Sequence, residues 1–227
     1  MNNLAIIPAR GGSKRIPRKN IKDFLGKPII AYSIEVAIKS ELFDEIMVST
    51  DDEEIAEIAI KYGAKVPFFR SKKNSDDYSS TMDVIKEVLR EYNLKLSINF
   101  DNACCIYPTA PLIKAEHLKS GFDKLISEGF TSVFTAVEFS YPIWRGLSLN
   151  EEGITNMIWP QYLNARSQDL PKAYHDAGQW YWFKPKNLTE SFFIGKPSIF
   201  KLNEIEVQDI DNLSDWEIAE LKYKLLC

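Results

Sequence analysis

The chain has 227 residues, of which 45% are hydrophobic and 26% are charged, and its formal net charge is −4. This composition is typical of a globular protein whose core is large enough to fold without a metal or a disulfide. The apolar stretch from Leu4 to Ala9 is too short for a signal peptide, and no stretch approaches the roughly 18 apolar residues of a membrane span. We therefore expect neither secretion nor insertion into a membrane.

The three cysteines also indicate a protein that is not secreted. Cys104 and Cys105 are adjacent and Cys227 ends the sequence, so the three fit neither a disulfide framework nor a CxxC metal site. We expect a reducing compartment, namely the cytoplasm.

The charge is distributed unevenly along the chain. Residues 10–27 carry seven lysines and arginines against the single acid Asp23, a local net charge of +6, which leaves −10 for the remainder. A nucleic-acid-binding protein is usually basic over a whole face. The pattern therefore predicts a local site for a small polyanion and no nucleic-acid partner.

Strands and helices are predicted to alternate up to residue 138. Short apolar runs predict strands at Leu4–Pro8, Glu45–Thr50, Ala64–Phe69, Ala103–Tyr107 and Thr131–Glu138. Helical periodicity and capping patterns predict helices that begin after Pro28, at the Asp51/Glu54 pair, at the Ser80/Asp83 pair and at residue 114. This order is typical of a three-layer α/β fold with a mostly parallel sheet.

Residues 139–183 break this alternation. They show no helical period and hold ten of the 28 aromatic residues, a density typical of interfaces and ligand sites. We expect a hairpin turn at 150–153, a strand at Gly178–Phe183 and a terminal helix capped by Ser214 and Glu217. The prediction is one domain, 1–227, in which the extension 139–183 either forms a dimer or covers the substrate.

The basic loop after the first strand is the first candidate site. Gly11 and Gly12 lack Cβ atoms, so backbone amides there can approach an anion, and the flanking cations can neutralise a triphosphate. The loop has neither Walker A nor GxGxxG spacing. The alternative is a solvated basic turn, since most runs of charge are exposed surface.

Asp209 and Asp211 form the second candidate site. In an extended segment residues i and i+2 face the same way, so both carboxylates meet on one side and suit Mg²⁺. Such pairs are also common on surfaces without any metal.

Two further segments carry polar groups. Arg70 follows a predicted strand and can reach a ligand at the sheet edge, while Ser80 can be a helix cap, an anion contact or both. Arg166 has a planar guanidinium that suits a carboxylate ligand. Of the two histidines, His117 is expected on a helix surface and His175 in a structural role.

These segments resemble the cytidylyltransferases that activate nine-carbon acidic sugars, the CMP-sialic acid synthetase group. The resemblance rests on IPARGGSKRIPRKN followed by GKPII, then STDD, RSKKNSDDYSST, PTAPL and DID, which occur in this order over most of the chain. It implies a Rossmann-like nucleotidyltransferase fold, CTP and an acidic nine-carbon sugar as substrates, and Mg²⁺ as the cofactor. It also implies a homodimer or a homotetramer.

The resemblance also implies roles for individual residues. The expected catalytic residues are Arg10, Lys19, Asn20 and Asp211, with Asp209 and Asp211 as the metal ligands. The residues expected to contact CTP are Ala9, Arg10, Gly11, Gly12, Lys14, Asn20, Arg70, Ser79 and Ser80. The residues expected to contact the sugar are Tyr107, Arg166 and Gln179.

The segment RSQDLPKAYHDAGQWYW, residues 166–182, is similar to the branch that activates pseudaminic acid. Sialic-acid members usually carry glutamine where this chain has Tyr107, which argues against ordinary sialic acid. The alternatives are a legionaminic or sialic acid synthetase and, from another class, a catalytically silent nucleotide-binding regulatory protein. The presence of DID together with the whole basic loop argues against a protein that binds a nucleotide without catalysing a reaction.

Overall fold

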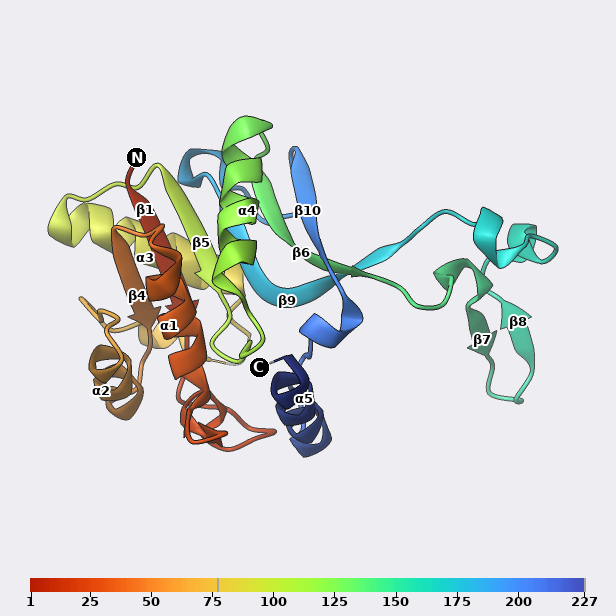
Figure 1. Cartoon of the computed structure of the whole chain (residues 1–227), viewed down its shortest axis with the longest axis horizontal. Coiled ribbons are helices and arrows are strands. Elements are labelled where there is room, and N and C mark those ends of the chain that lie inside the picture. The colour runs from red at the N-terminus through yellow and green to blue at the C-terminus, as the bar shows by residue number, and fades with distance from the viewer. Residues whose placement is uncertain (77, 227) are drawn as a thin grey trace.

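The computed structural model describes residues 1–76 and 78–226 (Figure 1). Asp77, which belongs to the segment RSKKNSDDYSST, and Cys227, counted among the cysteines, lie outside the described residues.

A mostly parallel sheet forms the centre of the molecule. In the described part of the chain it has six strands in the order β10-β6-β9-β5-β1-β4. The strands are β1 (Asn3–Pro8), β4 (Glu45–Ser49), β5 (Asn102–Ile106), β6 (Ser132–Glu138), β9 (Tyr174–Phe183) and β10 (Pro197–Leu202). Strand β1 pairs in parallel with β4 and β5, and β6 pairs in parallel with β10, whereas β9 runs antiparallel to both of its neighbours.

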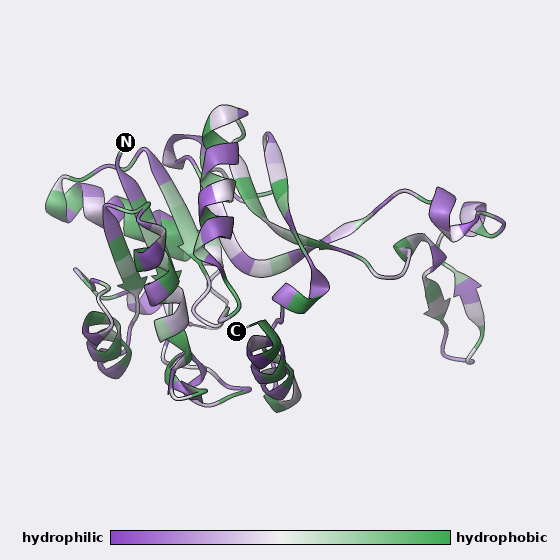
Figure 2. Ribbon diagram, viewed as in Figure 1, coloured by the Kyte–Doolittle hydropathy of each residue, from purple (hydrophilic) through white to green (hydrophobic). Residues whose placement is uncertain are grey.

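Helices cover both faces of this sheet (Figure 1). The helices are α1 (Ile29–Ser40), α2 (Glu53–Lys61), α3 (Thr81–Leu96), α4 (Ala115–Ser127) and α5 (Leu213–Leu226). Alternate residues of β1 point to opposite cores: Ala5 and Ile7 pack with α1 and α4, and Leu4 and Ile6 pack with α3. Hydrophobic residues accordingly follow the central strands in Figure 2. The structure confirms the predicted three-layer α/β fold.

Short elements complete the chain. Two small antiparallel ladders pair β2 (Asp23–Phe24) with β3 (Lys27–Pro28) and β7 (Leu147–Leu149) with β8 (Thr155–Met157). Single turns of 3₁₀ helix occur at Lys19–Ile21, Lys72–Asn74, Ile143–Arg145, Pro160–Tyr162, Ser167–Asp169, Pro185–Asn187 and Glu204–Glu206. Among the described residues, no helix combines the length and the apolar composition needed to cross a bilayer.

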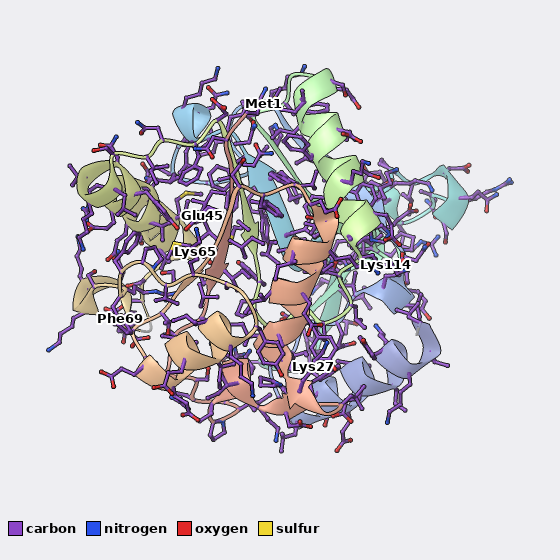
Figure 3. The ribbon with its side chains drawn as sticks, turned by 60° about the vertical axis from the view of Figure 1, so that its left-hand side comes forward. Met1, Lys27, Glu45, Lys65, Phe69 and Lys114 are labelled. Carbon is purple, nitrogen blue, oxygen red and sulfur yellow. The ribbon has the colours of Figure 1, made fainter. Side chains whose placement is uncertain are left out.

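The predicted strand at Ala64–Phe69 is wrong. Only Lys65 pairs with a strand, through a single bridge to Met47, because Pro67 lacks the N–H that a continuing ladder needs. The Lys65 side chain instead forms an ion pair with Glu45, with Nζ and Oε2 2.6 Å apart (Figure 3).

Two predicted helix caps are displaced. The cap of α2 is Asp52 and not Asp51, since the Asp52 carboxylate accepts a hydrogen bond from the N–H of Ile55 at 3.0 Å. Helix α5 is capped by Asn212 and Asp215 in place of Ser214 and Glu217: each side chain of this pair accepts from the other residue's backbone N–H. The Ser80/Asp83 capping box of α3 is confirmed.

His117 does not lie on an exposed helix surface as predicted. Its ring is partly buried against Phe200, with the ring centres 5.2 Å apart, and Nε2 lies 3.9 Å from a carboxylate oxygen of Glu206. Burial lowers the pKa of His117 in spite of that carboxylate. His175 is exposed, and its Nδ1 contacts the carbonyl of Asp176.

The segment between β6 and β9 projects from the body as an arm that carries β7 and β8 (Figure 1). The predicted hairpin turn is present, and Asn150 Oδ1 accepts from the N–H groups of Glu152 and Ile154. Several apolar side chains of the arm are largely exposed, including Leu149 and Leu163. The chain then returns as β9, which begins earlier than the predicted Gly178 and buries Trp180 and the three aromatic residues that follow it in the central sheet.

Candidate active site

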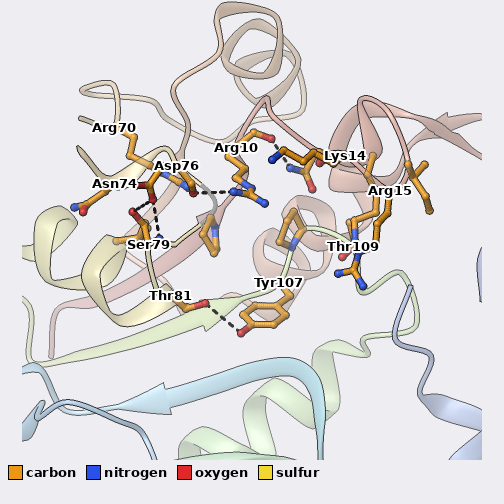
Figure 4. A pocket seen from close by; sticks show the side chains of 17 residues that line it. Arg10, Lys14, Arg15, Arg70, Asn74, Asp76, Ser79, Thr81, Tyr107 and Thr109 are labelled. Carbon is orange, nitrogen blue, oxygen red and sulfur yellow. Dashed lines mark hydrogen bonds between the residues drawn. The ribbon is translucent and has the colours of Figure 1, made fainter. Parts of the chain in front are cut away.

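A cavity of about 400 Å³ lies at the carboxyl ends of β1 and β5 (Figure 4). This is the edge where open α/β sheets bind their ligands. Three chain segments meet there: the basic loop after β1, the stretch between Arg70 and Thr81, and residues 107–109 after β5. Of the predicted site residues, Arg10, Lys14, Lys19, Asn20, Arg70, Ser79 and Tyr107 line the cavity.

The basic loop folds back on itself. Asn20 is 5% exposed, and its Nδ2 donates to the carbonyl of Arg10 at 2.9 Å, which ties the two ends of the loop together. Lys19 begins a turn of 3₁₀ helix, and its Nζ donates to the carbonyl of Ile210 at 2.6 Å. Burial lowers the pKa of Lys19 although Asp211 and Asp209 act against this shift. The ammonium is therefore held, poorly hydrated, between the loop and the acid pair.

Arg10 reaches across the cavity to the segment before α3 (Figure 4). Its Nη1 donates to the carbonyl of Asp76 at 2.7 Å. The Asp76 carboxylate in turn accepts from the N–H and the hydroxyl of Ser79, and the side-chain bond is the main cause of its lowered pKa. The guanidinium thus lies in the cavity with a local partner that an incoming phosphate can replace.

Arg70 is fixed by two hydrogen bonds to Ser49. Its Nε donates to the hydroxyl of Ser49 at 3.1 Å and its Nη2 donates to the carbonyl of the same residue. Burial lowers its pKa to about 10, so the group keeps its charge at neutral pH. The buried Glu87 accepts from the N–H of Ser71 at 2.7 Å and from the amide of Asn74, which fixes the chain just after Arg70.

Tyr107 forms one wall of the cavity. Its hydroxyl lies 3.3 Å from that of Thr81 (Figure 4). Its ring lies against Tyr181, with the ring centres 5.3 Å apart. Burial raises the pKa of the Tyr107 hydroxyl, so this group stays protonated at neutral pH. The wall therefore presents an aromatic face with one neutral hydroxyl.

The acid pair lies beside the basic loop. Asp211 forms an ion pair with Arg15, with Oδ2 and Nη1 2.7 Å apart. The pKa of Asp209 is raised, first by burial and then by the charge of Asp211. Among the described residues no group of three or more histidines, cysteines and acids is arranged to hold a metal. Two carboxylates nevertheless fit Mg²⁺, which commonly takes its other ligands from phosphate and water.

The remaining predicted residues divide into two groups. The backbone N–H of Ala9 donates to Ser49, that of Gly11 donates to Asp51, and the Ser80 hydroxyl serves the cap of α3. These residues and Gly12 adjoin the cavity residues in the chain but do not line the cavity.

Arg166 and Gln179 also do not line the cavity. Arg166 is exposed in the arm. Gln179 is 3% exposed and donates to the carbonyl of Glu206, while its Oε1 lacks a hydrogen-bond partner among the described residues.

Several lining residues were not predicted as contacts: Ser13, Arg15, Asn74, Asp76, Thr81 and Thr109. All six lie inside the motifs quoted from the sequence, so those motifs offered a signal for the segments that carry them. Asn74 and Asp76 are placed by the contacts of Glu87 and Arg10, which no local pattern reveals.

A family model described as cytidylyltransferase matches residues 4–141, which is more than half of the chain. The chain belongs to the cytidylyltransferase family. Membership of this family makes it a nucleotidyltransferase.

Two curated relatives and one solved structure illustrate the similarity. The chain is 50% identical over 227 residues to a pseudaminic acid cytidylyltransferase of Campylobacter jejuni, covering 99% of this chain and 97% of that protein. It is 34% identical over 226 residues to a CMP-N,N'-diacetyllegionaminic acid synthase of Legionella pneumophila, covering 97% and 95%. A structure of CMP:2-keto-3-deoxy-manno-octonic acid synthetase complexed with CTP covers 100% of both chains with a TM-score of 0.72 and 17% identity, which shows a shared fold.

Proposed function

We propose that this cytidylyltransferase converts CTP and pseudaminic acid into CMP-pseudaminic acid and pyrophosphate. The observation that carries the choice of sugar is the 50% identity to a pseudaminic acid cytidylyltransferase, against 34% to the legionaminic acid synthase, both over nearly the whole chain. The cavity supports the choice of nucleotide, because cations of the basic loop line it at the edge of a parallel sheet.

In this reaction the anomeric hydroxyl of the sugar gives up its proton to water, and its oxygen bonds to the α-phosphorus of CTP. The bond from that phosphorus to the bridging oxygen of the β-phosphate breaks, and pyrophosphate leaves with the electron pair. Such a transfer is accelerated mainly by positioning and by neutralising charge. We assign Arg10 and Lys19 to the phosphates with Lys14 in support, because all three line the cavity as cations. Asn20 orients the ribose or the α-phosphate.

The other nucleotide contacts are proposed from their places around the cavity. Arg70 is fixed beside the end of β4, where its fork of donors suits a base or a phosphate. Ser79 lines the cavity. Ala9, Gly11, Gly12 and Ser80 are also proposed to contact CTP, the first three through their backbone; they are chain neighbours of residues that line the cavity.

Asp209 and Asp211 are the residues that would hold Mg²⁺. When bound there, the ion would offset the negative charge of the phosphates next to the acid pair. The Lys19 contact with Ile210 keeps the acid pair close to the phosphate-binding loop.

The sugar contacts proposed are Tyr107, Arg166 and Gln179. Tyr107 already lines the cavity, with an aromatic face that suits an amphipathic sugar. Arg166 lies in the projecting arm, so it reaches a sugar carboxylate only if the arm of one copy extends over the cavity of another. Gln179 would contact the sugar only after its side chain leaves Glu206.

A direct assay tests the reaction. The protein is incubated with CTP, Mg²⁺ and separate samples of pseudaminic, legionaminic and sialic acid, and released pyrophosphate is measured. We expect the fastest release with pseudaminic acid. Faster release with either other sugar would replace the proposed substrate, and CTP binding without release from any sugar would support a silent nucleotide-binding protein.

The arm leads to a prediction about assembly. We propose a homodimer or a homotetramer, because the arm exposes Leu147, Leu149 and Leu163, and apolar patches of this kind favour association. Sedimentation velocity at micromolar concentration is expected to show a dimer or a tetramer. Replacing the three leucines with serine should shift the protein toward the monomer, and a wild-type protein that sediments as a monomer would reject this assembly.

We also propose a cytoplasmic location. The described cysteines Cys104 and Cys105 are buried and free, which suits a reducing compartment.

A further inference from the structure

Two adjacent acids at the start of α2 contact the basic loop at both of its ends. At one end, the N–H of Gly11 donates to Asp51 Oδ1 at 3.0 Å. At the other end, the Arg18 guanidinium donates to both carboxylate oxygens of Asp52, Nη2 to Oδ1 at 2.9 Å and Nη1 to Oδ2 at 2.5 Å. Arg18 also contacts Glu54. Of the loop residues that line the cavity, Lys14 and Arg15 lie between these two anchored points, and Arg10, Lys19 and Asn20 lie within two residues of them.

Arg18 sets the conformation of the residues that follow it. Its backbone has φ 54° and ψ 29°, a left-handed conformation that costs about 1 to 2 kcal/mol for a residue with a Cβ. Its carbonyl accepts from the N–H groups of Ile21 at 2.9 Å and Lys22 at 3.0 Å, so the turn that carries Lys19 and Asn20 starts from Arg18. Such a conformation persists when surrounding contacts enforce it. The bond to Asp52 is such a contact.

Asp52 is itself a rigid support. Its Oδ1 caps α2 by accepting from Ile55 at 3.0 Å, and its own N–H donates to Thr50 Oγ1 at 3.1 Å. Gly11 packs against the same carboxylate, because a Cβ at Gly11 would lie 2.6 Å from Asp52 Oδ2. The paired guanidinium lowers the pKa of Asp52, so the carboxylate is ionised at neutral pH.

These contacts also separate Arg18 from the other cations of the loop. Arg10, Lys14, Arg15 and Lys19 line the cavity, whereas Arg18 does not. Two acids already engage its guanidinium. A bidentate pair of this kind fixes direction as well as distance.

We propose that Asp52 is a positioning residue for nucleotide binding, which acts through Arg18 to place Lys19 and Asn20, with Asp51 holding the opposite end of the loop at Gly11. Arg18 in this arrangement is a structural cation and not a phosphate ligand. The inference rests on the proposed function in one respect, namely that the basic loop binds CTP.

The test separates the helix cap from the bond to Arg18. Serine is a good N-cap but too short to bind the guanidinium with two bonds, so Asp52→Ser keeps the first role and removes the second. We expect the Kd for CTP, measured by calorimetry, to rise about tenfold, which corresponds to ~1.4 kcal/mol. The KM for the sugar should stay within twofold while the KM for CTP rises. Glu53→Gln is the matched control, because it removes one exposed acid from the same turn of α2 and should leave the Kd within twofold.

A double-mutant cycle decides whether the two residues act together. Arg18→Ala should raise the Kd for CTP as much as Asp52→Ser does, and the double variant should be no weaker than either single variant, because residues acting as one unit are not additive. Unchanged Kd values in both single variants, or losses that add, would overturn the proposal. If Asp52→Ser fails to fold, Asp52→Asn keeps the cap and one bond to Arg18, and it should show a smaller rise in Kd; no rise would equally overturn the proposal.

The proposed function is tested separately, with the wild-type protein. Wild-type protein that binds CTP but forms no CMP-sugar refutes the function and leaves the positioning role standing. Wild-type protein that forms product while both variants bind CTP normally refutes the positioning role alone.

Discussion

Replacing Asp211 with alanine is expected to slow Mg²⁺-dependent pyrophosphate release by roughly 10²- to 10³-fold, the loss typical of removing one charged contact to a transition state. The fold should survive, because Asp211 is partly exposed and its described side-chain ion pair is with Arg15, whose side chain is 69% exposed. Exposed pairs contribute at most about 1 kcal/mol to stability. Initial rates and a thermal melt, both measured on the same preparation, check the two halves of this expectation.

Two further variants identify what Asp211 does. Arg15→Ala removes the ion pair but leaves the carboxylate, so a much smaller loss than that of Asp211→Ala would show that Asp211 does not act through the ion pair. Glu217→Gln removes another exposed acid nearby on α5 and should leave the rate unchanged. Full activity of Asp211→Ala would withdraw the metal assignment.

The central sheet could be predicted because its strands are buried on both faces. A continuous apolar run such as Leu4–Ile7 leaves few alternatives once helical segments flank it. The predicted strand at Ala64–Phe69 shows the limit of that pattern. Its composition is also largely apolar, but a single residue, Pro67, removes the N–H that a second pairing needs.

Helix starts were harder to place than helices. Asp51 and Asp52 are the same residue type, and only the fold decides which one caps α2 and which one holds Gly11. At α5 the pattern Ser214/Glu217 fits a capping box, yet Asn212 and Asp215 form the cap two residues earlier. The competing pairs have similar capping strength, so tertiary packing makes the choice.

In the candidate site, too, local sequence patterns predicted some residues, while contacts between distant segments place the others. The basic loop could be predicted because its glycines and cations are contiguous in the sequence, and seven predicted residues do line one cavity. The position of Asp76 in the cavity wall could not be predicted, because it depends on a contact with Arg10, which is 66 residues away. Arg166 lies in the exposed arm of its own chain, and no pattern along the sequence shows which copy of the protein it would serve.

The second large effect is expected at Arg10. Arg10→Ala should weaken CTP binding and lower kcat/KM for CTP by roughly 10²- to 10³-fold, because a cation at the end of β1 is lost from the phosphate site. Arg10→Lys should recover part of the loss, since lysine keeps the charge but lacks the planar fork that binds two phosphate oxygens. Calorimetry with CTP and initial rates of pyrophosphate release measure both effects.

The structure also supplies a control and an internal check for Arg10. Arg90 lies on the exposed side of α3 with Glu91 as its partner, so Arg90→Ala changes the net charge equally and should leave CTP binding unchanged. A phosphate that binds the Arg10 guanidinium competes with the bond from its Nη1 to the carbonyl of Asp76. Saturating CTP should therefore change the backbone amide signals of Asp76 and Ser79 more strongly in the wild type than in Arg10→Ala. Unchanged CTP affinity in Arg10→Ala would mean that the basic loop is a solvated turn and that the phosphates bind elsewhere.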